Sequence, residues 1–272
     1  MISQTLHTHT TFCDGKNSVE EMILGALKLG LDSIGLSAHS ELPFYSRWSM
    51  QPGVSPHYHA EVLRQRERYG DRIPIFLGLE QDYFSNPPEQ EYEYIIGSVH
   101  YVKKGDAIYP MDKSAEAIQQ AADEGYGGDV MGLAEDYYAL VADVARKTRC
   151  QIVGHFDLLC KYNEGDCCFD THNARYMAAA TDALDVLAKQ DLVFEINTGA
   201  MARGKRVTPY PARELLLAMR ERNLPICICS DSHSAETLLY GYREASELAR
   251  SCGYRECMYW DGRQFHAGPL PG

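Results

Sequence analysis

The 272-residue sequence lacks any run of 18 or more apolar residues, so we expect no transmembrane helix and no membrane partner. Its first residues, MISQTLHTHTTF, have neither the basic nor the apolar region that begins a signal peptide, which favours a cytoplasmic location. Basic residues are scarce, with 26 Lys and Arg against 38 Asp and Glu. The resulting net charge of −12 argues against binding to nucleic acid through its phosphates, although bound metal ions can reverse the charge of a local site.

The sequence also lacks cysteine pairs typical of disulfides or metal sites, and it lacks a motif for a catalytic serine. The nine cysteines include no CxxC pair, and adjacent Cys167 and Cys168 are poorly placed for a mutual disulfide, so we expect reduced and mostly buried thiols. The sequence has no Ser-His-Asp arrangement. We therefore expect no protein nucleophile.

Short apolar runs alternate with segments of helical periodicity, a pattern typical of parallel strands joined by crossover helices. The seven strand-length runs are residues 2–6, 33–37, 73–79, 94–99, 151–154, 192–196 and 225–229. Ser18 and Glu21 form a capping-box pattern for a helix that Gly30 ends, and further helices are predicted after Asp129 and from Thr171. Pro211 is expected at a first helical position. These patterns predict one α/β domain over residues 1–272, a closed or distorted barrel with a doubly wound open sheet as the alternative. Loops are expected at residues 41–56 and 161–169.

Polar side chains follow all seven expected strands, at the ends where barrels build their active sites. Six histidines and three carboxylates among them are potential metal ligands: His7, His9, Asp14, His39, Glu80, His100, His155, Asp231 and His233. Imidazole and carboxylate suit zinc, manganese and iron. Nine ligands are too many for one tetrahedral ion and sufficient for two or three ions if a carboxylate bridges. Because alternate side chains of a strand share a face, His7 and His9 can bind one ion together.

The other polar residues receive different interpretations. Asp157 is either a partner of His155 or a turn residue, and we do not expect Glu195 or Asn197 to be metal ligands. The remaining four histidines are not expected to bind metal. We assign His57 and His59 to a helix, and His172 and His266 to the surface.

The ordered motifs HTHT with Asp14-Gly15, SAHS, GLE, GSVHY, GHFD and SDSH resemble the PHP (polymerase and histidinol phosphatase) superfamily from residue 6 to about residue 233. GSVHY and the segment EINTGAMARG are similar to its histidinol-phosphatase branch. The resemblance implies a distorted (β/α)7 barrel with a trinuclear metal centre at the C-terminal ends of the strands.

The same resemblance implies how the ligands divide among three ions. His7, His9, Glu80 and Asp231 would hold the first ion. Glu80 would bridge to a second ion that His100 and His155 also hold, and Asp14, His39 and His233 would hold the third. The family often has histidine in place of Asp14, and it has aspartate where this chain has Ala38, so the third site and the orientation of His39 can differ here.

The implied activity is hydrolysis of L-histidinol phosphate, in histidine biosynthesis, by attack of a metal-bridging hydroxide. Three divalent ions outweigh three carboxylates and a hydroxide by about two positive charges, which a phosphate monoester dianion balances. Asp231 is the expected proton acceptor, His233 the expected acid and Glu80 the bridge. Arginine suits phosphate through its planar fork. Candidates for substrate contact at the rim are Arg203, Arg206, Arg47 and Tyr101, with Tyr45 and Trp48 as further aromatic candidates.

Two alternatives stay open. The same centre could serve a phosphodiesterase or nuclease, or a phosphatase for nucleotides or another small phosphate ester. The second alternative is a degenerate domain that binds a metal or a partner without catalysis. Against it, all nine ligand positions are filled. The sequence does not indicate an oligomeric state.

Overall fold

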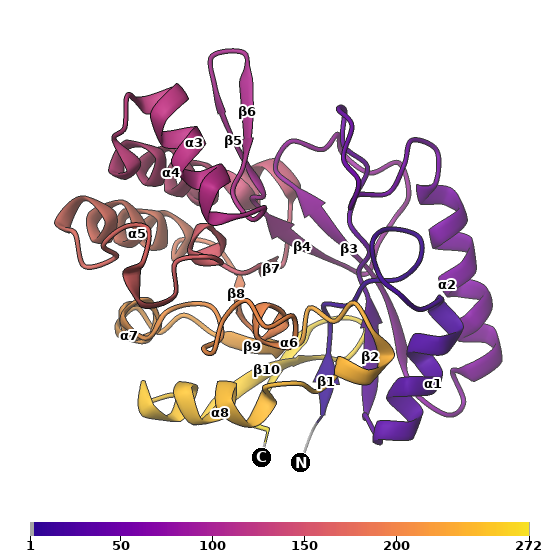
Figure 1. Cartoon of the computed structure of the whole chain (residues 1–272). Coiled ribbons are helices and arrows are strands. Elements are labelled where there is room, and N and C mark those ends of the chain that lie inside the picture. The colour runs from indigo at the N-terminus through magenta and orange to yellow at the C-terminus, as the bar shows by residue number, and fades with distance from the viewer. Residues whose placement is uncertain (1–2, 272) are drawn as a thin grey trace.

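The computed structural model describes residues 3–271, so Ile2 of the first expected strand lies outside the described residues. Seven strands form one parallel sheet in the order β1-β2-β3-β4-β7-β8-β9, with helices around its outside (Figure 1). Their bounds are β1 Gln4–Thr5, β2 Ser33–Leu36, β3 Ile75–Asp82, β4 Tyr94–Ser98, β7 Ile152–Val153, β8 Val193–Asn197 and β9 Ile226–Cys229. Each falls on one of the seven predicted runs.

The first and last strands meet, so the sheet is a nearly closed barrel. The backbone N–H of His9 donates to the carbonyl of Ser232 at 2.8 Å, and the N–H of Ser232 donates to the carbonyl of His7 at 3.2 Å. The hydroxyls of Thr5 and Ser230 lie 3.0 Å apart across the same seam. The structure thus confirms the distorted (β/α)7 barrel and not the open sheet.

The helices alternate with the barrel strands, as the apolar spacing predicts. The capping box at Ser18 is present, and Gly30 ends the first helix with φ of 73°. The helices are α1 Val19–Leu29, α2 Ser55–Tyr69, α3 Ala115–Tyr126, α4 Val130–Thr148, α5 Ala174–Leu187, α6 Gly199–Ala202, α7 Arg213–Glu221 and α8 Tyr242–Ser251. Short 3-10 turns occupy Leu158–Cys160, Glu164–Asp166 and Ala235–Thr237. No helix within residues 3–271 is long and apolar enough to cross a membrane.

Several predicted boundaries are wrong by a few residues. Strand β3 continues past residue 79, since Asp82 still pairs with Ser98 of β4, so Glu80 lies inside the strand. Helix α5 begins after Asn173, whose side chain accepts from the N–H of Arg175, rather than at Thr171. Helix α2 already begins at Ser55, within the expected loop at residues 41–56.

Pro211 is not at a first helical position. Tyr210 exchanges two backbone hydrogen bonds of 2.9 Å with Asn197, which keeps the chain extended up to the proline. Helix α7 therefore begins only at Arg213.

Side chains fill the barrel interior below the strand ends. Tyr94 is fully buried there, and a Cβ at Gly35 or Gly78 would lie 2.1 Å from its side-chain atoms, so both positions require glycine. Trp260 packs into the same cluster as Leu6 and Tyr94, and its backbone is bonded to the side-chain amide of Gln4. This end is thus closed by packing, which leaves the opposite end for chemistry.

Two antiparallel hairpins complete the chain. One hairpin, β5 Tyr101–Lys104 with β6 Ala107–Pro110, projects from the body of the molecule (Figure 1). The other, β10 Glu256–Trp260 with β11 Phe265–Pro269, supplies Trp260. All nine cysteines are free thiols, and six of them are buried.

Candidate metal centre

The nine predicted ligands come together at the C-terminal ends of the barrel strands. Strand β3 contributes Glu80 from within, and the segments that follow β1, β2, β4, β7 and β9 contribute the rest. Glu80, 1% exposed, is at the centre of the cluster. Its two carboxylate oxygens lie within 3.5 Å of an imidazole nitrogen of each of five histidines: His7, His9, His39, His100 and His155. One carboxylate thus faces five histidines from four segments of the barrel, the position that a bridging ligand needs.

A second group gathers around Asp14. Its Oδ1 lies 3.2 Å from Nε2 of His233 and 3.7 Å from Nε2 of His39. Ligand atoms of Asp14, His39, His233 and His9 all lie within 4.8 Å of one another. Burial would raise the pKa of Asp14, but His39 and His233 outweigh it and lower that pKa below its usual range. Asp14 is therefore a carboxylate ready to bind a cation.

The remaining carboxylate, Asp231, faces the histidine pair of the first segment. Its Oδ1 lies 3.0 Å from Nε2 of His9 and 3.8 Å from Nε2 of His7. Asp231 has φ of +43°, a left-handed conformation that is uncommon for residues other than glycine. Strained backbone of this kind is often kept at functional sites, where the surrounding structure holds it in place.

Orphaned polar atoms show that this cluster fits metal ions. Four buried atoms that face one another have no hydrogen-bond partner among residues 3–271, although their distances to each other are short: Nε2 of His7, Nε2 of His9, Nδ1 of His39 and Oε2 of Glu80. Buried polar atoms are rarely left unpaired, because each costs free energy. A cation between them would satisfy all four at once, and imidazole with carboxylate is the donor set of zinc, manganese and iron sites.

Buried acids and imidazoles of the cluster stabilise each other's charged forms even without an ion. Burial would lower the pKa of His7, but Glu195 and Glu80 outweigh it and raise that pKa well above its usual value. Burial would likewise raise the pKa of Glu80, yet His39 and His7 lower it well below its usual value. Protons on imidazoles thus take the place of metal charge, and metal ions would have to displace them.

Two buried carboxylates orient the ligands from behind. Oε1 of Glu195 lies 2.6 Å from Nδ1 of His7, so Nε2 of that ring faces Glu80. Asp82 does the same for His100, with its Oδ2 3.0 Å from Nδ1. Such partners fix the ring and its tautomer. The sequence offered a signal for both: Glu195 is on the same face of its strand as Asn197, and Asp82 follows Glu80 by two residues.

Arg203 closes one side of the cluster. Its Nη2 donates to Oδ2 of Asp231 at 3.0 Å, and its Nη1 lies 2.7 Å from Nδ1 of His233. Burial would raise the pKa of Asp231, but Arg203 and His7 lower it well below its usual value. The Nε–H of Arg203 is buried without a partner among the described residues. This arginine therefore keeps a free donor beside the ligands.

The other candidates for substrate contact differ in whether they contact the metal ligands. Trp48 is near, because its ring centroid lies 4.4 Å from that of His39 and 4.7 Å from that of His100. Tyr101 stacks on Trp48 with centroids 5.8 Å apart. Arg47 and Tyr45, in the same loop, are exposed.

Arg206 points elsewhere. Its Nη1 donates to the carbonyl of Cys160 at 2.6 Å and its Nη2 to the hydroxyl of Thr208 at 3.1 Å. The first bond ties this segment to the buried 3-10 turn Leu158–Cys160, and the structure does not bring this arginine to the ligands.

Residues outside the predicted site are placed as follows. His57 and His59 lie in helix α2, and Nε2 of His59 is bonded to the carbonyl of Glu91. His172 and His266 have exposed side chains. Asp157 accepts from the N–H of Ala212 at 3.0 Å and makes no hydrogen bond to the ring of His155, so it holds a loop rather than a ligand.

Comparison with known proteins places this geometry in a family. The PHP domain family model matches residues 5–199, which is more than half of the chain. A Deinococcus radiodurans protein named "Probable histidinol-phosphatase" is 29% identical over 93% of this chain and 95% of its own length. The crystal structure of hisK from Listeria monocytogenes covers 89% of this chain and 99% of its own, with a TM-score of 0.74 and 23% identity.

A second solved structure is the histidinol phosphate phosphatase of Lactococcus lactis subsp. lactis, complexed with zinc, L-histidinol and phosphate. It covers 97% of this chain and 98% of its own, with a TM-score of 0.69 and 20% identity. Both structures share the barrel fold with this chain. With its family model, its barrel and its converging ligands, the chain belongs to the PHP domain family.

Proposed function

We propose that this chain is a metal-dependent phosphomonoesterase that hydrolyses L-histidinol phosphate to L-histidinol and phosphate. The convergence of nine imidazole and carboxylate ligands on one end of a PHP barrel carries the proposal. Relatives that match nearly the whole chain are named histidinol-phosphatases, which supports the substrate. The enzyme acts as one domain over residues 1–272, in the cytoplasm, on a small phosphate monoester.

The ligands divide among up to three divalent ions of zinc, manganese or iron. His7, His9 and Asp231 would hold a first ion, and Glu80 would join it to a second ion held by His100 and His155. Asp14, His39 and His233 would hold a third. The observations behind this division are the position of Glu80 among five histidines and the contacts of Asp14 with His233 and with Nε2 of His39, whose Nδ1 faces Glu80.

When bound, the ions lower the pKa of water and stabilise charge on the phosphoryl oxygens. The chain's own groups bind the substrate and move the protons. The unpartnered Nε–H of Arg203 donates to a phosphoryl oxygen. As Arg203 turns toward that oxygen, Oδ2 of Asp231 loses its present partner and can accept the proton of the attacking water.

Trp48 and Tyr101 form the wall that receives the flat imidazole of the substrate. Trp48 packs against His39 and His100, and Tyr101 stacks on Trp48, so a ring placed on this wall is held next to the ligands. Arg47, exposed in the same loop as Trp48, is available to reach the phosphate from outside.

The test is a phosphate-release assay on purified protein with its metal content quantified. We expect turnover of L-histidinol phosphate, loss of turnover with a chelator, and recovery on addition of Zn²⁺, Mn²⁺ or Fe²⁺. Full activity after rigorous metal removal would refute the proposal, as would turnover of oligonucleotide ends without any turnover of histidinol phosphate.

A pair of variants locates the activity. Glu80→Ala should lower both metal content and turnover, because this carboxylate contacts five of the ligands. His57→Ala is the matched control, since His57 is an exposed histidine of helix α2. A fully metallated and active Glu80→Ala protein would contradict the assignment.

A further inference from the structure

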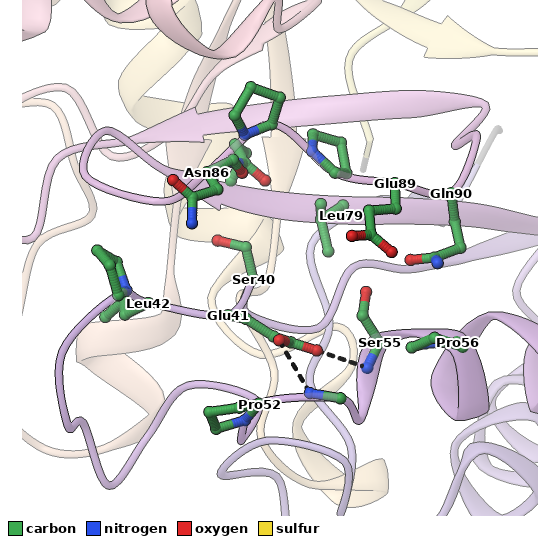
Figure 2. A pocket seen from close by; sticks show the side chains of 15 residues that line it. Ser40, Glu41, Leu42, Pro52, Ser55, Pro56, Leu79, Asn86, Glu89 and Gln90 are labelled. Carbon is green, nitrogen blue, oxygen red and sulfur yellow. Dashed lines mark hydrogen bonds between the residues drawn. The ribbon is translucent and has the colours of Figure 1, made fainter.

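A second cavity of about 420 Å³ lies beside the barrel, under the loop that links β2 to helix α2. Figure 2 shows its lining, with Ser40 and Glu41 on one side and Asn86, Glu89 and Gln90 on the other. This volume is within the range of small-molecule sites. None of the nine metal ligands lines the cavity.

The cavity is on the outer side of the barrel wall. Leu79 and Gln81 line it, and Glu80 between them faces the metal centre. Successive side chains of a strand point to opposite faces of the sheet. A molecule in the cavity is therefore separated from the metal centre by the backbone of β3, and it cannot be the substrate bound for hydrolysis.

The charge of the lining selects against phosphate. The lining residues include two carboxylates and no Lys, Arg or His. Glu41 already accepts from the N–H groups of Gly53 and Ser55, at 3.0 and 2.9 Å (Figure 2). Glu89 is exposed, and its carboxylate has no cationic partner within 4.0 Å among residues 3–271. With no basic group to offset these acids, an anion in the cavity would be repelled.

A buried acceptor completes the polar part of the cavity. Gln81 is 2% exposed, and its Nε2 donates to the carbonyl of Asn86 at 2.7 Å. Its Oε1 has no hydrogen-bond partner within the described part of the chain. An unpaired buried acceptor costs free energy, so a ligand that donates an N–H there is favoured.

Apolar groups stand beside the polar side chains of Ser40, Ser55, Asn86 and Gln90 in the rest of the lining. Two leucines contribute, and five pyrrolidine rings surround the polar groups: Pro43, Pro52, Pro56, Pro87 and Pro88. Such surfaces suit a planar ring rather than a flexible polar chain. The lining thus combines acceptors for N–H donors with walls for a ring.

We propose that this cavity binds a small organic cation: a flat ring that donates N–H, joined to an ammonium group, and without phosphate. The ring N–H bonds to Oε1 of Gln81, and the ammonium lies beside the Glu89 carboxylate. The site is distinct from the metal centre and goes beyond the proposed function, and only the choice of L-histidinol as the probe rests on that function.

The test is calorimetric titration of the metal-loaded protein with L-histidinol. We expect two classes of binding site, one at the metal centre and one at the cavity. L-Histidine, whose added carboxylate faces the acidic lining, should fill only the metal-centre class, and inorganic phosphate should not compete for the cavity class.

Two exposed acids of one loop provide matched variants. Glu89→Gln should weaken the cavity class about three- to fivefold, the size of one exposed charge interaction. Glu91→Gln makes the same charge change two residues away, outside the lining, and should leave both classes unchanged. Gln81→Met removes the buried acceptor and should weaken the cavity class about tenfold.

A single class of site in the wild-type protein would overturn the proposal, as would equal effects of Glu89→Gln and Glu91→Gln or equal cavity binding of L-histidine. Failure of the proposed function is a separate result. In that case histidinol phosphate is not hydrolysed, while the weaker L-histidinol binding of Glu89→Gln still supports the cavity.

Discussion

Replacement of Glu195 by glutamine tests the support behind the metal centre. The Glu195 carboxylate is 1% exposed and accepts three hydrogen bonds. Oε1 faces Nδ1 of His7 at 2.6 Å, and Oε2 accepts from the backbone N–H of His155 at 2.7 Å and from Nδ2 of Asn197 at 2.9 Å. Asn197 cannot reverse its amide, because its Oδ1 accepts from the N–H of Gly199. A glutamine has one acceptor oxygen for these three donors.

Each orientation of the new amide has its own cost. If its oxygen faces His7, its NH₂ meets the donors of His155 and Asn197, and two orphaned donors cost about 2–6 kcal/mol of stability. If its oxygen faces those donors, its NH₂ meets Nδ1 of His7 and forces the ring proton onto Nε2. That nitrogen faces Glu80 at 3.1 Å and can then no longer bind a cation. The second orientation preserves the fold, and we expect it to lower metal affinity roughly 10- to 100-fold.

The assay is elemental analysis after dialysis against a metal buffer, together with phosphate release and a thermal melt. We expect a folded Glu195→Gln protein with less metal and proportionally less turnover. Glu221→Gln, an exposed acid at the end of α7, is the control for loss of charge. Full metal content with turnover within about twofold of wild type would refute the role of Glu195 as the orienting partner, because that role predicts a larger loss.

Three further predictions concern the same centre. Gly199→Ala places a Cβ 2.6 Å from Oδ2 of Asp231, so displacement of that ligand should lower metal content, measured by elemental analysis, while the melt shows a folded protein. Arg203→Ala should reduce kcat/KM by about 10²-fold with no loss of metal content, since it removes a charged donor to the phosphoryl group; an unchanged kcat/KM would exclude that contact. Glu80 and Asp82 outweigh burial and raise the pKa of His100 to about 10, so the protonated ring stabilises the metal-free fold below about pH 6.5, and this contribution is lost as the pH rises toward 10. Metal binding at pH 7 should therefore release protons and tighten with pH, and calorimetry in buffers of different ionisation enthalpy checks it; uptake without proton release would contradict the assignment.

The seven strands and their ligands are predictable from the sequence because both follow from one rule. A strand buried on both faces is a short apolar run, and in a parallel barrel the residues after each run must meet at one end. His39, His100 and His155 share no local sequence signal, yet each follows such a run and all contact Glu80. The rule needs only approximate boundaries, so the extension of β3 beyond residue 79 did not affect the prediction.

The partners behind the ligands are harder to predict. Whether Glu195 binds a metal or orients a ligand depends on which ring nitrogen it faces, and this is set by the register of β8 against its neighbours. The destination of Arg206 depends on a carbonyl of a distant loop, Cys160, which no spacing in the sequence reveals. Tertiary contacts of single atoms, rather than patterns of residues, decide such roles.

His233 and Arg203 show how one proton separates two states of this centre. Nη1 of Arg203 can only donate, so Nδ1 of His233 must accept from it, which places the ring proton on Nε2 toward Asp14. To bind an ion through Nε2, the ring must instead carry its proton on Nδ1, where the carbonyl of Asp231 lies 3.0 Å away as an acceptor. Arg203 then has to leave His233. Metal binding at Asp14 and His233 and release of Arg203 toward a phosphate are thus coupled by a single tautomer. For the same reason His233 cannot use Nε2 both as a ligand and as the donor of a proton to the leaving group.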